Sequence, residues 1–572
     1  MKNLEIAQIF YLMSELMEMK ESDFRSRAYN RAARTLESLE EDVENIYQQG
    51  GTKSLEKIPG IGQALAEKIE EFIKTGKIKA YQKLKKECPV DLENLTLIEG
   101  LGPRKIKALY QKLGVKNIKD LDKAARTGKI RELENFGAKS EKNILQAIEF
   151  VKADQGRFLL GEILPKVREI IKQLDILPEA GRISIAGSIR RMKETIGDVD
   201  ILATSFKPPK VMDYFVHLPE VVKIWAQGKT KSSVRFKRGF DCDLRIVKPE
   251  SFGAALQYFT GSKEHNISVR RLAQKKGLKL NEYGVFKKNK KIAGKNEKEV
   301  YQAIGLPYIE PELRTNSGEI EAGLAGKLPK LIDCQDIKGE THCHSNWSDG
   351  ANGILEIAQT ARKMGYQYIV ITDHVGFLKI ANGLDEKRLL RQMAEIDKIN
   401  KKISGIKILK GAEVDIKMDG SLAIKDEILA KLDMVIGAIH SGFKMNKTDM
   451  TKRITRAIEN PNVDIFAHPT GRKISVRESY QVDLGEVFKA AKKNQTALEI
   501  NAHYVRLDLK DTDIRQAIEA GVKLAIGTDA HAANQLPMME FGIAQARRGW
   551  ANKKDILNTR SLGGFLEYFK RK

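Results

Sequence analysis

Two aspartates separated by one residue begin an apolar stretch and have the spacing of metal ligands. Because successive side chains of a strand point to opposite faces, Asp198 and Asp200 would project to the same side. A second strand-like stretch carries Asp241 and Asp243, one of which would add a third carboxylate if the strands pair. The alternation of side chains along a strand does not determine whether Asp241 or Asp243 would be that carboxylate. Three carboxylates around two Mg²⁺ ions about 3.5–4 Å apart are what in-line phosphoryl transfer to a hydroxyl requires.

A small turn and two cations precede the first aspartate pair. Gly187 and Ser188 would let backbone N–H groups and a hydroxyl approach a triphosphate, and Arg190 and Arg191 would neutralise it. A lone D-x-D is usually a solvated strand end, and a lone Gly-Ser pair is usually a turn. Their order here, followed by another acidic strand, predicts a nucleotidyl-transfer site.

Histidines gather in the last part of the chain, where seven of the nine follow residue 340. His342 and His344 would share one face of a strand, which turns Cys343 toward the core. A structural, hydrogen-bonded role is usual for a single histidine at a strand end, but here six strand-like runs end in metal-binding residue types. The further candidates are Asp349, His374, Glu413, His440, His468, Asp529 and His531.

The elements around these candidates are apolar strands that alternate with amphipathic helices. This pattern predicts a parallel β/α barrel-like domain, a fold that places its sites at the carboxyl ends of the strands. Mixed imidazole and carboxylate ligands suit Mn²⁺, Zn²⁺ or Fe²⁺, and a multinuclear cluster of such ions favours phosphoester hydrolysis. We expect Asp373, Asp415 and His503 to support the ligands or the fold.

Three turns near the amino terminus each open a helix, at spacings of about forty residues. Backbone N–H groups at such helix starts can bind a DNA phosphate without reading the base. One such turn alone would be an ordinary helical turn, but three indicate helix-hairpin-helix clamps. In the third, Asn135 replaces the first glycine, because asparagine tolerates positive φ. The glycines expected to contact DNA are Gly60, Gly62, Gly100, Gly102 and Gly137.

Length and charge agree with a nucleic-acid partner. With 572 residues, 42% hydrophobic and 31% charged, the chain should form about three to five globular domains. Its net charge of +23 predicts a polyanionic partner, with an anionic membrane surface as the alternative to nucleic acid. No apolar run approaches the roughly 20 residues of a membrane span. Four cysteines without a C-x-x-C pair indicate a cytoplasmic protein.

Residues after the second acidic strand carry a resemblance to family X DNA polymerases. The segments 258–262 (Tyr-Phe-Thr-Gly-Ser) and 280–284 (Leu-Asn-Glu-Tyr-Gly) match the nucleotide-binding and thumb segments of that family in order and spacing, as do Asn266 and Arg270 between them. The resemblance implies Asp243 as the third ligand, because Leu-Arg follows it. It implies two Mg²⁺ or Mn²⁺ ions on Asp198, Asp200 and Asp243. It also implies that Gly187, Ser188 and Arg191 bind the triphosphate and that Arg270 contacts DNA. The residues implied to contact the nucleotide are Tyr258, Phe259, Gly261 and Asn266.

The same resemblance gives Lys68 a role in lyase chemistry. A Schiff base with an abasic sugar needs a lysine whose amine is free at neutral pH. Ala64 stands where animal relatives carry another lysine, and a phosphate-contacting role for Lys68 stays open. We expect the basic tract from residue 275 to 298 to follow template phosphates.

The histidine-rich part resembles the PHP domain, named for polymerases and histidinol phosphatase, which carries a trinuclear cluster. The resemblance implies up to three Mn²⁺, Zn²⁺ or Fe²⁺ ions. Their implied ligands are His342, His344, Asp349, His374, Glu413, His440, His468, Asp529 and His531.

The expected fold class is multidomain: α-helical helix-hairpin-helix domains, an α+β nucleotidyltransferase palm and thumb, and a β/α barrel-like PHP domain. The expected boundaries are 1–89 for a lyase-like domain with the first hairpin, 90–153 for a fingers-like domain with the other two, 154–258 for the palm, 259–315 for the thumb, 316–333 for a linker and 334–572 for the PHP domain.

This arrangement resembles bacterial family X DNA polymerases fused to a PHP domain. It implies a monomeric enzyme that uses dNTPs to fill short gaps in gapped or primer–template DNA during base excision repair. The PHP domain would act as a 3′ to 5′ exonuclease or 3′-end phosphoesterase, with AP endonuclease and 5′-deoxyribose phosphate lyase as further expected activities. Two alternatives stay open: a nucleotidyltransferase that does not act on DNA, and a PHP phosphatase whose first half binds DNA without catalysis.

Overall fold

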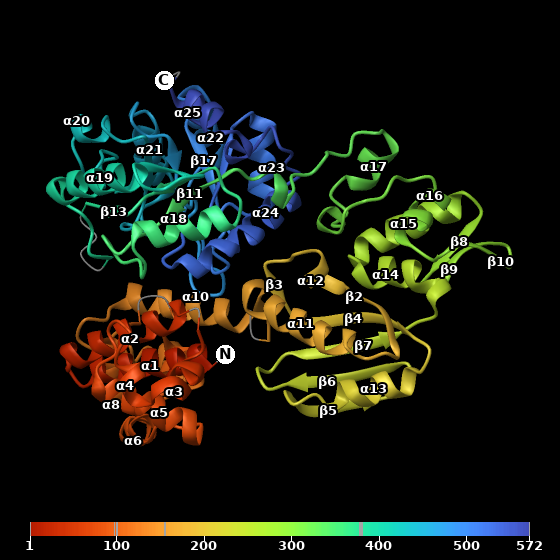
Figure 1. Cartoon of the computed structure of the whole chain (residues 1–572), viewed down its shortest axis with the longest axis horizontal. Coiled ribbons are helices and arrows are strands. Elements are labelled where there is room, and N and C mark those ends of the chain that lie inside the picture. Colours follow the sequence, from red (N-terminus) through yellow and green to blue (C-terminus); the bar gives the residue numbers. More distant parts are fainter. Residues whose placement is uncertain are drawn as a thin grey trace.

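Four folded regions follow one another along the chain (Figure 1). The structure is a computed structural model that describes residues 2–39, 41–96, 98, 101–153, 156–376 and 381–570. We call its parts the helical region (2–153), the central sheet (158–246), the thumb region (249–324) and the C-terminal barrel (339–569). The predicted order of fold classes is confirmed.

The helical region packs around one core. A continuous cluster of buried apolar side chains extends from Ile6 to Ile148, so the expected boundary at 89/90 crosses a shared interior. Lys107 Nζ lies 2.8 Å from Glu21 Oε1 and links its two halves. Its helices are α1 (Lys2–Met19), α2 (Asp23–Ser38), α3 (Val43–Gly50), α4 (Thr52–Leu55), α5 (Gln63–Thr75), α6 (Lys79–Glu87), α7 (Leu92–Leu95), α8 (Pro103–Leu113), α9 (Ile118–Arg126) and α10 (Ala138–Ala153).

The central sheet has the strand order β2-β4-β7-β6-β5, with β4 and β7 parallel and the other pairs antiparallel. Val199 and Cys242 are buried with α11 and α13 in one core, so alternation turns the aspartates of β4 and β7 to the opposite face. The elements are β1 (Phe158–Leu159), α11 (Leu160–Asp175), β2 (Ala180–Ile185), α12 (Gly187–Arg190), β3 (Thr195–Ile196), β4 (Asp198–Ser205), α13 (Pro208–Val216), β5 (Val221–Gln227), β6 (Lys231–Phe236) and β7 (Asp241–Ile246).

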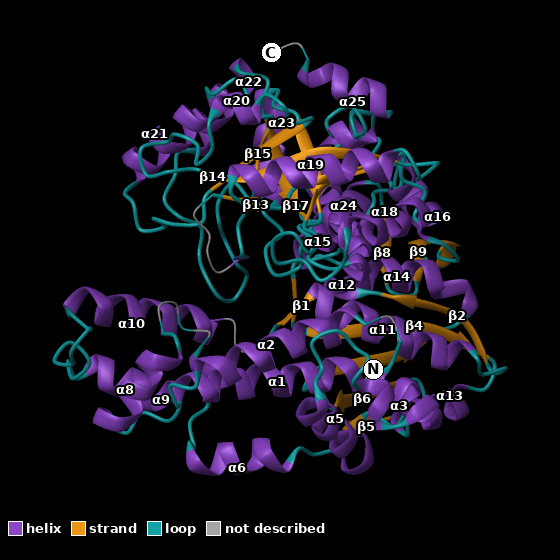
Figure 2. Cartoon of the chain, turned by 60° about the vertical axis from the view of Figure 1, so that its left-hand side comes forward, coloured by secondary structure: helices purple, strands orange, loops and turns teal. Residues whose placement is uncertain are grey.

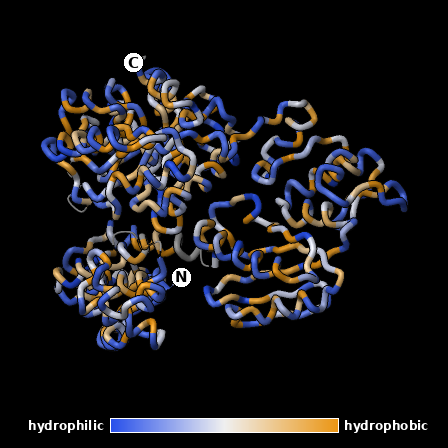
Figure 3. Tube along the Cα trace, in the orientation of Figure 1, coloured by the Kyte–Doolittle hydropathy of each residue, from blue (hydrophilic) through white to orange (hydrophobic). Residues whose placement is uncertain are grey.

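The thumb region combines helices with the antiparallel sheet β10-β9-β8. The lysine-rich hairpin between β9 and β10 is hydrophilic at the edge of the molecule in Figure 3. The expected linker 316–333 is folded instead, because Ile320 belongs to the thumb core and Leu331 packs against that core. The elements are η1 (Pro249–Ser251), α14 (Phe252–Thr260), α15 (Lys263–Lys275), β8 (Leu278–Asn281), β9 (Gly284–Lys287), β10 (Lys290–Ala293), α16 (Glu297–Ala303), η2 (Pro311–Leu313) and α17 (Glu319–Leu324).

The C-terminal barrel is a parallel sheet of order β11-β12-β14-β15-β16-β17-β18, with β13 beside β14. Its ends approach each other, since Asp529 N donates to His342 O at 2.8 Å. Tyr368 packs inside against Phe565 of α25, whereas Ile369 faces the helices.

Helices alternate with the barrel strands, as the sequence pattern predicts. The elements are η3 (Cys334–Asp336), β11 (Gly339–Cys343), α18 (Ile354–Lys363), β12 (Tyr368–Ile371), β13 (His374–Val375), α19 (Glu386–Asn400), β14 (Lys407–Asp415), α20 (Asp426–Leu429), β15 (Met434–Ala438), α21 (Lys447–Ile458), β16 (Ile465–Phe466), α22 (Leu484–Lys493), β17 (Ala497–Asn501), α23 (Asp511–Ala520), β18 (Leu524–Gly527), η5 (Ala533–Met538), α24 (Met539–Arg548), η6 (Leu557–Thr559) and α25 (Leu562–Phe569).

The barrel and the central sheet share a packed interface (Figure 2). Leu507 and Phe541 of the barrel are buried in the core of the central sheet. Arg472 Nη1 donates to Glu194 Oε2 at 3.1 Å across the same boundary. The two regions are therefore fixed against each other. No helix in the described part of the chain has both the length and the apolarity of a membrane span.

Candidate metal centres

Three carboxylates meet on the open face of the central sheet. In the parallel pairing of β4 with β7, Asp198 lies opposite Asp241 and Asp200 lies opposite Asp243. Burial, together with the charges of Asp198 and Asp243, raises the pKa of Asp200 to about 6. Bound divalent cations would offset this repulsion, and an all-oxygen donor set suits Mg²⁺ or Mn²⁺.

The structure separates the two candidates for the third ligand. Asp241 is held by Arg235, whose Nε and Nη2 donate to its two oxygens at 2.8 and 2.9 Å, and by Trp225 Nε1 at 2.9 Å. Asp243 lies directly beside Asp200, accepts from Ser233 Oγ at 2.5 Å and has Lys231 Nζ 2.9 Å from its Oδ2. Since the charges of Asp198 and Asp243 both act on Asp200, these three carboxylates are the candidate ligand set.

The backbone of the turn before β4 passes close to this carboxylate cluster. Gly187 has φ +66°, and a Cβ there would lie 2.7 Å from Asp200 Oδ2. Glycine is therefore required both by conformation and by space. Ser188 follows in α12, half-buried, at the same end of the sheet.

The two arginines of this turn have different environments. Arg190 Nη1 donates to Glu297 Oε1 at 2.9 Å and to Thr260 Oγ1 at 2.6 Å, so it joins the central sheet to the thumb region. Glu297 also accepts from Arg314 Nη1 at 2.6 Å, so one carboxylate is shared by two guanidinium groups, and the expected triphosphate contact of Arg190 stays a prediction. Arg191 donates to the Thr260 carbonyl, while its buried Nε has no hydrogen-bond partner among the described residues.

Arg191 lies in a strongly positive environment. Burial, with the nearby guanidinium groups of Arg548 and Arg314, lowers the pKa of Arg191 to about 10. Arg548, from barrel helix α24, also donates to the Arg191 carbonyl oxygen at 3.2 Å. An anion beside Arg191 would be stabilised by these charges, which agrees with the triphosphate site implied by the family resemblance.

The other expected nucleotide residues surround the same corner. Tyr258 and Phe259 have ring centroids 5.1 Å apart, and Gly261 has φ +70° with its space limited by Arg191. Asn266 is 8% exposed, and its Nδ2 donates to the Tyr258 carbonyl at 2.7 Å. The Asn266 Oδ1 accepts from Gln257 Nε2 at 2.7 Å, so in this structure its amide holds the Tyr258 backbone rather than facing an open site.

Among the described residues, Arg270 and Lys68 each donate a hydrogen bond to a carbonyl oxygen one helical turn earlier. Arg270 Nε donates to the Asn266 carbonyl at 3.2 Å. Lys68 Nζ donates to the Ala64 carbonyl at 2.8 Å, one helical turn earlier. Both side chains are half-buried at the surface of their helices.

The hairpin glycines are accessible. A Cβ at Gly62, Gly102 or Gly137 would meet no described atom within 4 Å, so a phosphate can approach these helix starts closely. Gly60 and Asn135 have φ of +83° and +66°, as the repeated turn predicts. The expected contact Gly100 lies outside the described residues.

All nine expected barrel ligands converge at the carboxyl ends of the strands. Three groups have ligand atoms within 4.8 Å of one another, and His344 and His374 each belong to two of them. His468, which is outside these groups, has its Nε2 at 3.0 Å from Glu413 Oε1. The groups are His344, Asp349, His374 and His531; His342, His344 and Asp529; and His374, Glu413 and His440.

The polar atoms at the middle of the barrel cluster fit cations. Glu413 Oε2 and His374 Nδ1 are 2.7 Å apart, but their geometry does not form a hydrogen bond. His344 Nδ1 is also buried without a hydrogen-bond partner in the described residues. Buried polar atoms need partners, and a mixed nitrogen and oxygen set suits Mn²⁺, Zn²⁺ or Fe²⁺.

Charge is unevenly distributed within this cluster. Burial opposes protonation of His440, but the carboxylates of Glu413 and Asp415 together outweigh it and raise the pKa of His440 to about 9. Burial, with the nearby His531 and His374, lowers the pKa of His344 to about 3. Only a neutral imidazole binds a metal ion. Cations must therefore compete with a proton at His440, whereas the ring of His344 is already neutral.

Carboxylates behind the ligands orient them. Glu499 Oε1 lies 2.5 Å from His342 Nδ1, and Glu499 Oε2 accepts from the His468 backbone N–H at 2.7 Å. Asp415 Oδ1 lies 2.7 Å from His440 Nδ1, which agrees with the expected supporting role of Asp415. Sequence reasoning missed Glu499; its signal was an acidic residue inside the apolar strand β17.

The other two expected supporting residues also lie in the barrel, where Asp373 is buried and His503 is half-buried. Asp373 accepts from the Ser345 backbone N–H at 2.8 Å and holds the loop after His344. Burial lowers the pKa of His503 to about 4 and keeps its ring neutral.

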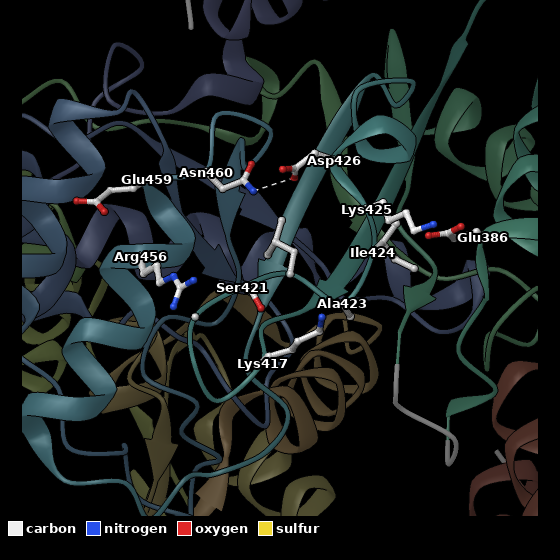
Figure 4. A pocket seen from close by; sticks show the side chains of 12 residues that line it. Glu386, Lys417, Ser421, Ala423, Ile424, Lys425, Asp426, Arg456, Glu459 and Asn460 are labelled. Carbon is white, nitrogen blue, oxygen red and sulfur yellow. Dashed lines mark hydrogen bonds between the residues drawn. The ribbon is translucent and has the colours of Figure 1, made fainter.

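A cleft of about 710 Å³ opens elsewhere on the barrel and contains none of the expected ligands (Figure 4). Its lining mixes cations such as Lys417 and Arg456 with acids such as Asp426, which accepts from Asn460 Nδ2 at 2.9 Å. We therefore locate the barrel site by its converging ligands rather than by this cleft.

Domain families match the chain in the predicted order. They are a helix-hairpin-helix domain over residues 1–78, a SAM-like helix-hairpin-helix tandem over 92–149, a DNA polymerase beta thumb over 255–315 and a PHP domain over 340–503.

The similar curated proteins include a full-length relative and shorter ones. The DNA polymerase/3′-5′ exonuclease PolX of Bacillus subtilis (strain 168) is 39% identical over 576 residues, covering 100% of both chains. Shorter relatives cover 41% of this chain. They include a probable phosphatase of Thermoanaerobacter sp. (strain X514), 34% identical over 94% of its own length, and one of Caldanaerobacter subterraneus, 33% identical over 91%.

Proposed function

Since the chain belongs to the bacterial family X DNA polymerases that carry a C-terminal PHP domain, we propose that it fills short gaps in DNA and trims 3′ ends. The observation that carries the polymerase assignment is the register of β4 with β7. It sets Asp200 beside Asp243, with Asp198 on the same face.

In the polymerase step the primer 3′-hydroxyl attacks the α-phosphate of a bound dNTP, and pyrophosphate leaves. When bound, Mg²⁺ or Mn²⁺ supplies activation of the attacking oxygen and charge neutralisation at the phosphates. Asp198, Asp200 and Asp243 would hold these ions. Gly187 gives the phosphates close access to the backbone, and Ser188 and Arg191 bind the triphosphate.

In the barrel, the nine ligands would hold up to three cations around the 3′ end of a strand. When bound, Mn²⁺, Zn²⁺ or Fe²⁺ supplies water activation and a charge clamp for phosphoester hydrolysis. Glu499 and Asp415 fix the ring orientation of His342 and His440. The helical region grips the DNA backbone through the open glycines of its hairpins.

A one-nucleotide gapped duplex with a 3′-hydroxyl, supplied with dNTPs or NTPs, tests the polymerase assignment. Asp200→Ala should abolish extension, while Asp213→Ala, on the helix that covers the opposite sheet face, should extend like the wild type. Equal extension by Asp200→Ala would refute the assignment. Extension with NTPs alone would favour a nucleotidyltransferase of a different class.

The barrel could instead act on a small phosphorylated metabolite. This second candidate is favoured by the probable phosphatases, which match a stretch about as long as the barrel. Phosphate release should be compared between a gapped duplex with a 3′-phosphate and a small phosphomonoester. Preference for the DNA supports end trimming, and preference for the small ester supports the metabolite phosphatase.

Lys68 is proposed to form a Schiff base with an abasic sugar. Borohydride should trap the wild-type protein on DNA with a 5′-deoxyribose phosphate, and Lys68→Arg should give no trapped product. Equal trapping by Lys68→Arg would leave phosphate contact as its role.

A further inference from the structure

We propose that Trp225, with Lys223 and Arg235, forms a contact surface for the DNA strand end that enters the polymerase site. This inference rests on the proposed polymerase function and adds a binding site to it. Its ligand class is the sugar, base and phosphate of nucleotides next to the reacting 3′ end.

The indole of Trp225 is exposed but held in place. It lies on the edge strand β5 and is 46% exposed, although tryptophan side chains are highly buried on average. Its Nε1 donates to Asp241 Oδ1 at 2.9 Å, which fixes the ring on the same sheet face as Asp243. An aromatic side chain restrained in this way loses little conformational entropy when it binds a partner.

Two cations flank the ring. Lys223 Nζ lies 3.8 Å from the indole centroid, and the Arg235 guanidinium carbon lies 5.2 Å from it. Arg235 neutralises Asp241 through two hydrogen bonds, so Lys223 leaves the surface with a positive charge. An exposed aromatic ring beside cations is a combination that binds nucleic-acid strands, through stacking and phosphate attraction.

The order of the strands in the sheet indicates which substrate reaches this surface. The nucleotide residues lie with α12 at the β2–β4 side, whereas β6 and β5 extend away on the other side of the carboxylates (Figure 1). In-line transfer requires the attacking hydroxyl and the leaving pyrophosphate on opposite sides of the phosphorus. The strand that carries the hydroxyl should therefore cross β7 toward β6 and β5, where Trp225 lies.

The opposite face of β5 provides a matched control. Ile224 is 43% exposed, but it pairs with Val234, which is buried against the helices, so it faces away from Asp241 and Asp243. A protein partner for this edge would use the apolar side chains of that face. DNA would use the charged face of Trp225.

The direct test uses tryptophan fluorescence. The chain has three tryptophans, so Trp347→Phe with Trp550→Phe leaves Trp225 as the sole reporter. Titration of this protein with a primer–template duplex should quench and shift the Trp225 emission. Trp225→Ala and Trp225→Phe in the otherwise unchanged chain should be compared with Ile224→Ala for DNA binding and extension. We expect Trp225→Ala to weaken DNA binding about tenfold and to leave the KM for dNTP unchanged.

The outcomes separate this inference from the function on which it rests. An unchanged Trp225 emission with DNA, or equal DNA affinity of Trp225→Ala and wild type, overturns the contact surface even if primers are extended. Equal losses in Ile224→Ala and Trp225→Ala would also overturn it, because they would indicate a protein partner or a fold effect. Failure of the wild type to extend any primer would instead overturn the polymerase function.

Discussion

The two cation sites of this chain are built in opposite ways. The central-sheet site uses three carboxylates from two adjacent strands, and Asp198 is exposed. The candidate barrel site gathers nine side chains at the ends of many strands, and Glu413 among them is 1% exposed. An open oxygen site can exchange its cations with each nucleotide, whereas an enclosed imidazole-rich cage should keep them.

The largest contrast should appear when one ligand is removed from each site. Glu413→Gln should reduce 3′-end cleavage more than about a hundredfold and lower stability by roughly 3–5 kcal/mol, because it leaves buried imidazoles without their central carboxylate. Asp198→Asn should abolish extension without a loss of stability, since Asp198 is exposed. Thermal melting and both activities should be measured for each variant; equal melting temperatures would contradict the contrast.

Metal removal should divide the activities in the same way. After brief dialysis against a chelator, Mg²⁺ alone should restore extension, whereas 3′-end cleavage should fall slowly and return only with Mn²⁺, Zn²⁺ or Fe²⁺. Metal content can be followed by elemental analysis during dialysis. Rapid loss of both activities and joint recovery with Mg²⁺ would show that the barrel site does not retain its cations.

Glu499→Gln should have an intermediate effect. The variant keeps every barrel ligand but weakens the orientation of His342, so we expect a loss of about 10–100-fold in 3′-end cleavage. Extension by the same preparation should be normal and serves as the control for folding. A cleavage rate equal to that of the wild type would remove Glu499 from the site.

Arg548→Ala should give the smallest effect. It is a substitution in the barrel that should change nucleotide binding at the central sheet. This barrel residue donates to the carbonyl oxygen of Arg191 at 3.2 Å, so its loss should raise the KM for dNTP about fivefold while 3′-end cleavage is kept. Arg168→Ala, which breaks an exposed ion pair with Glu540 in the same interface, is the matched control. Equal effects of the two variants would mean that Arg548 only holds the interface together.

The sequence predicts local patterns better than partnerships between distant residues. Asp198 and Asp200 could be found from spacing, but the choice of Asp243 over Asp241 needed family resemblance, because both lie on one strand face. Arg190 is predicted to neutralise a triphosphate, but its ion pair with Glu297, far along the chain, could not be read from the sequence. Glu499 was missed for the same reason, since its partner His342 is distant in sequence.

The expected domain boundaries stay predictions, and side chains pack across two of them. The family and the order of folds are confirmed. However, buried apolar residues of the expected first two domains share one core. Ile320, in the expected linker, is buried in the core of the thumb region. Apolar periodicity identifies helices but does not show which of them share an interior.

The central claim is that two separate cation sites act in turn on one DNA end. A gapped duplex with a 3′-phosphate and dNTPs tests it most directly, with products separated by length and end group. Asp200→Ala should leave a trimmed, unextended 3′-hydroxyl, and His344→Ala should leave the 3′-phosphate intact while still extending a matched 3′-hydroxyl duplex. Loss of both steps in either variant, or retention of both steps in either, would contradict the account.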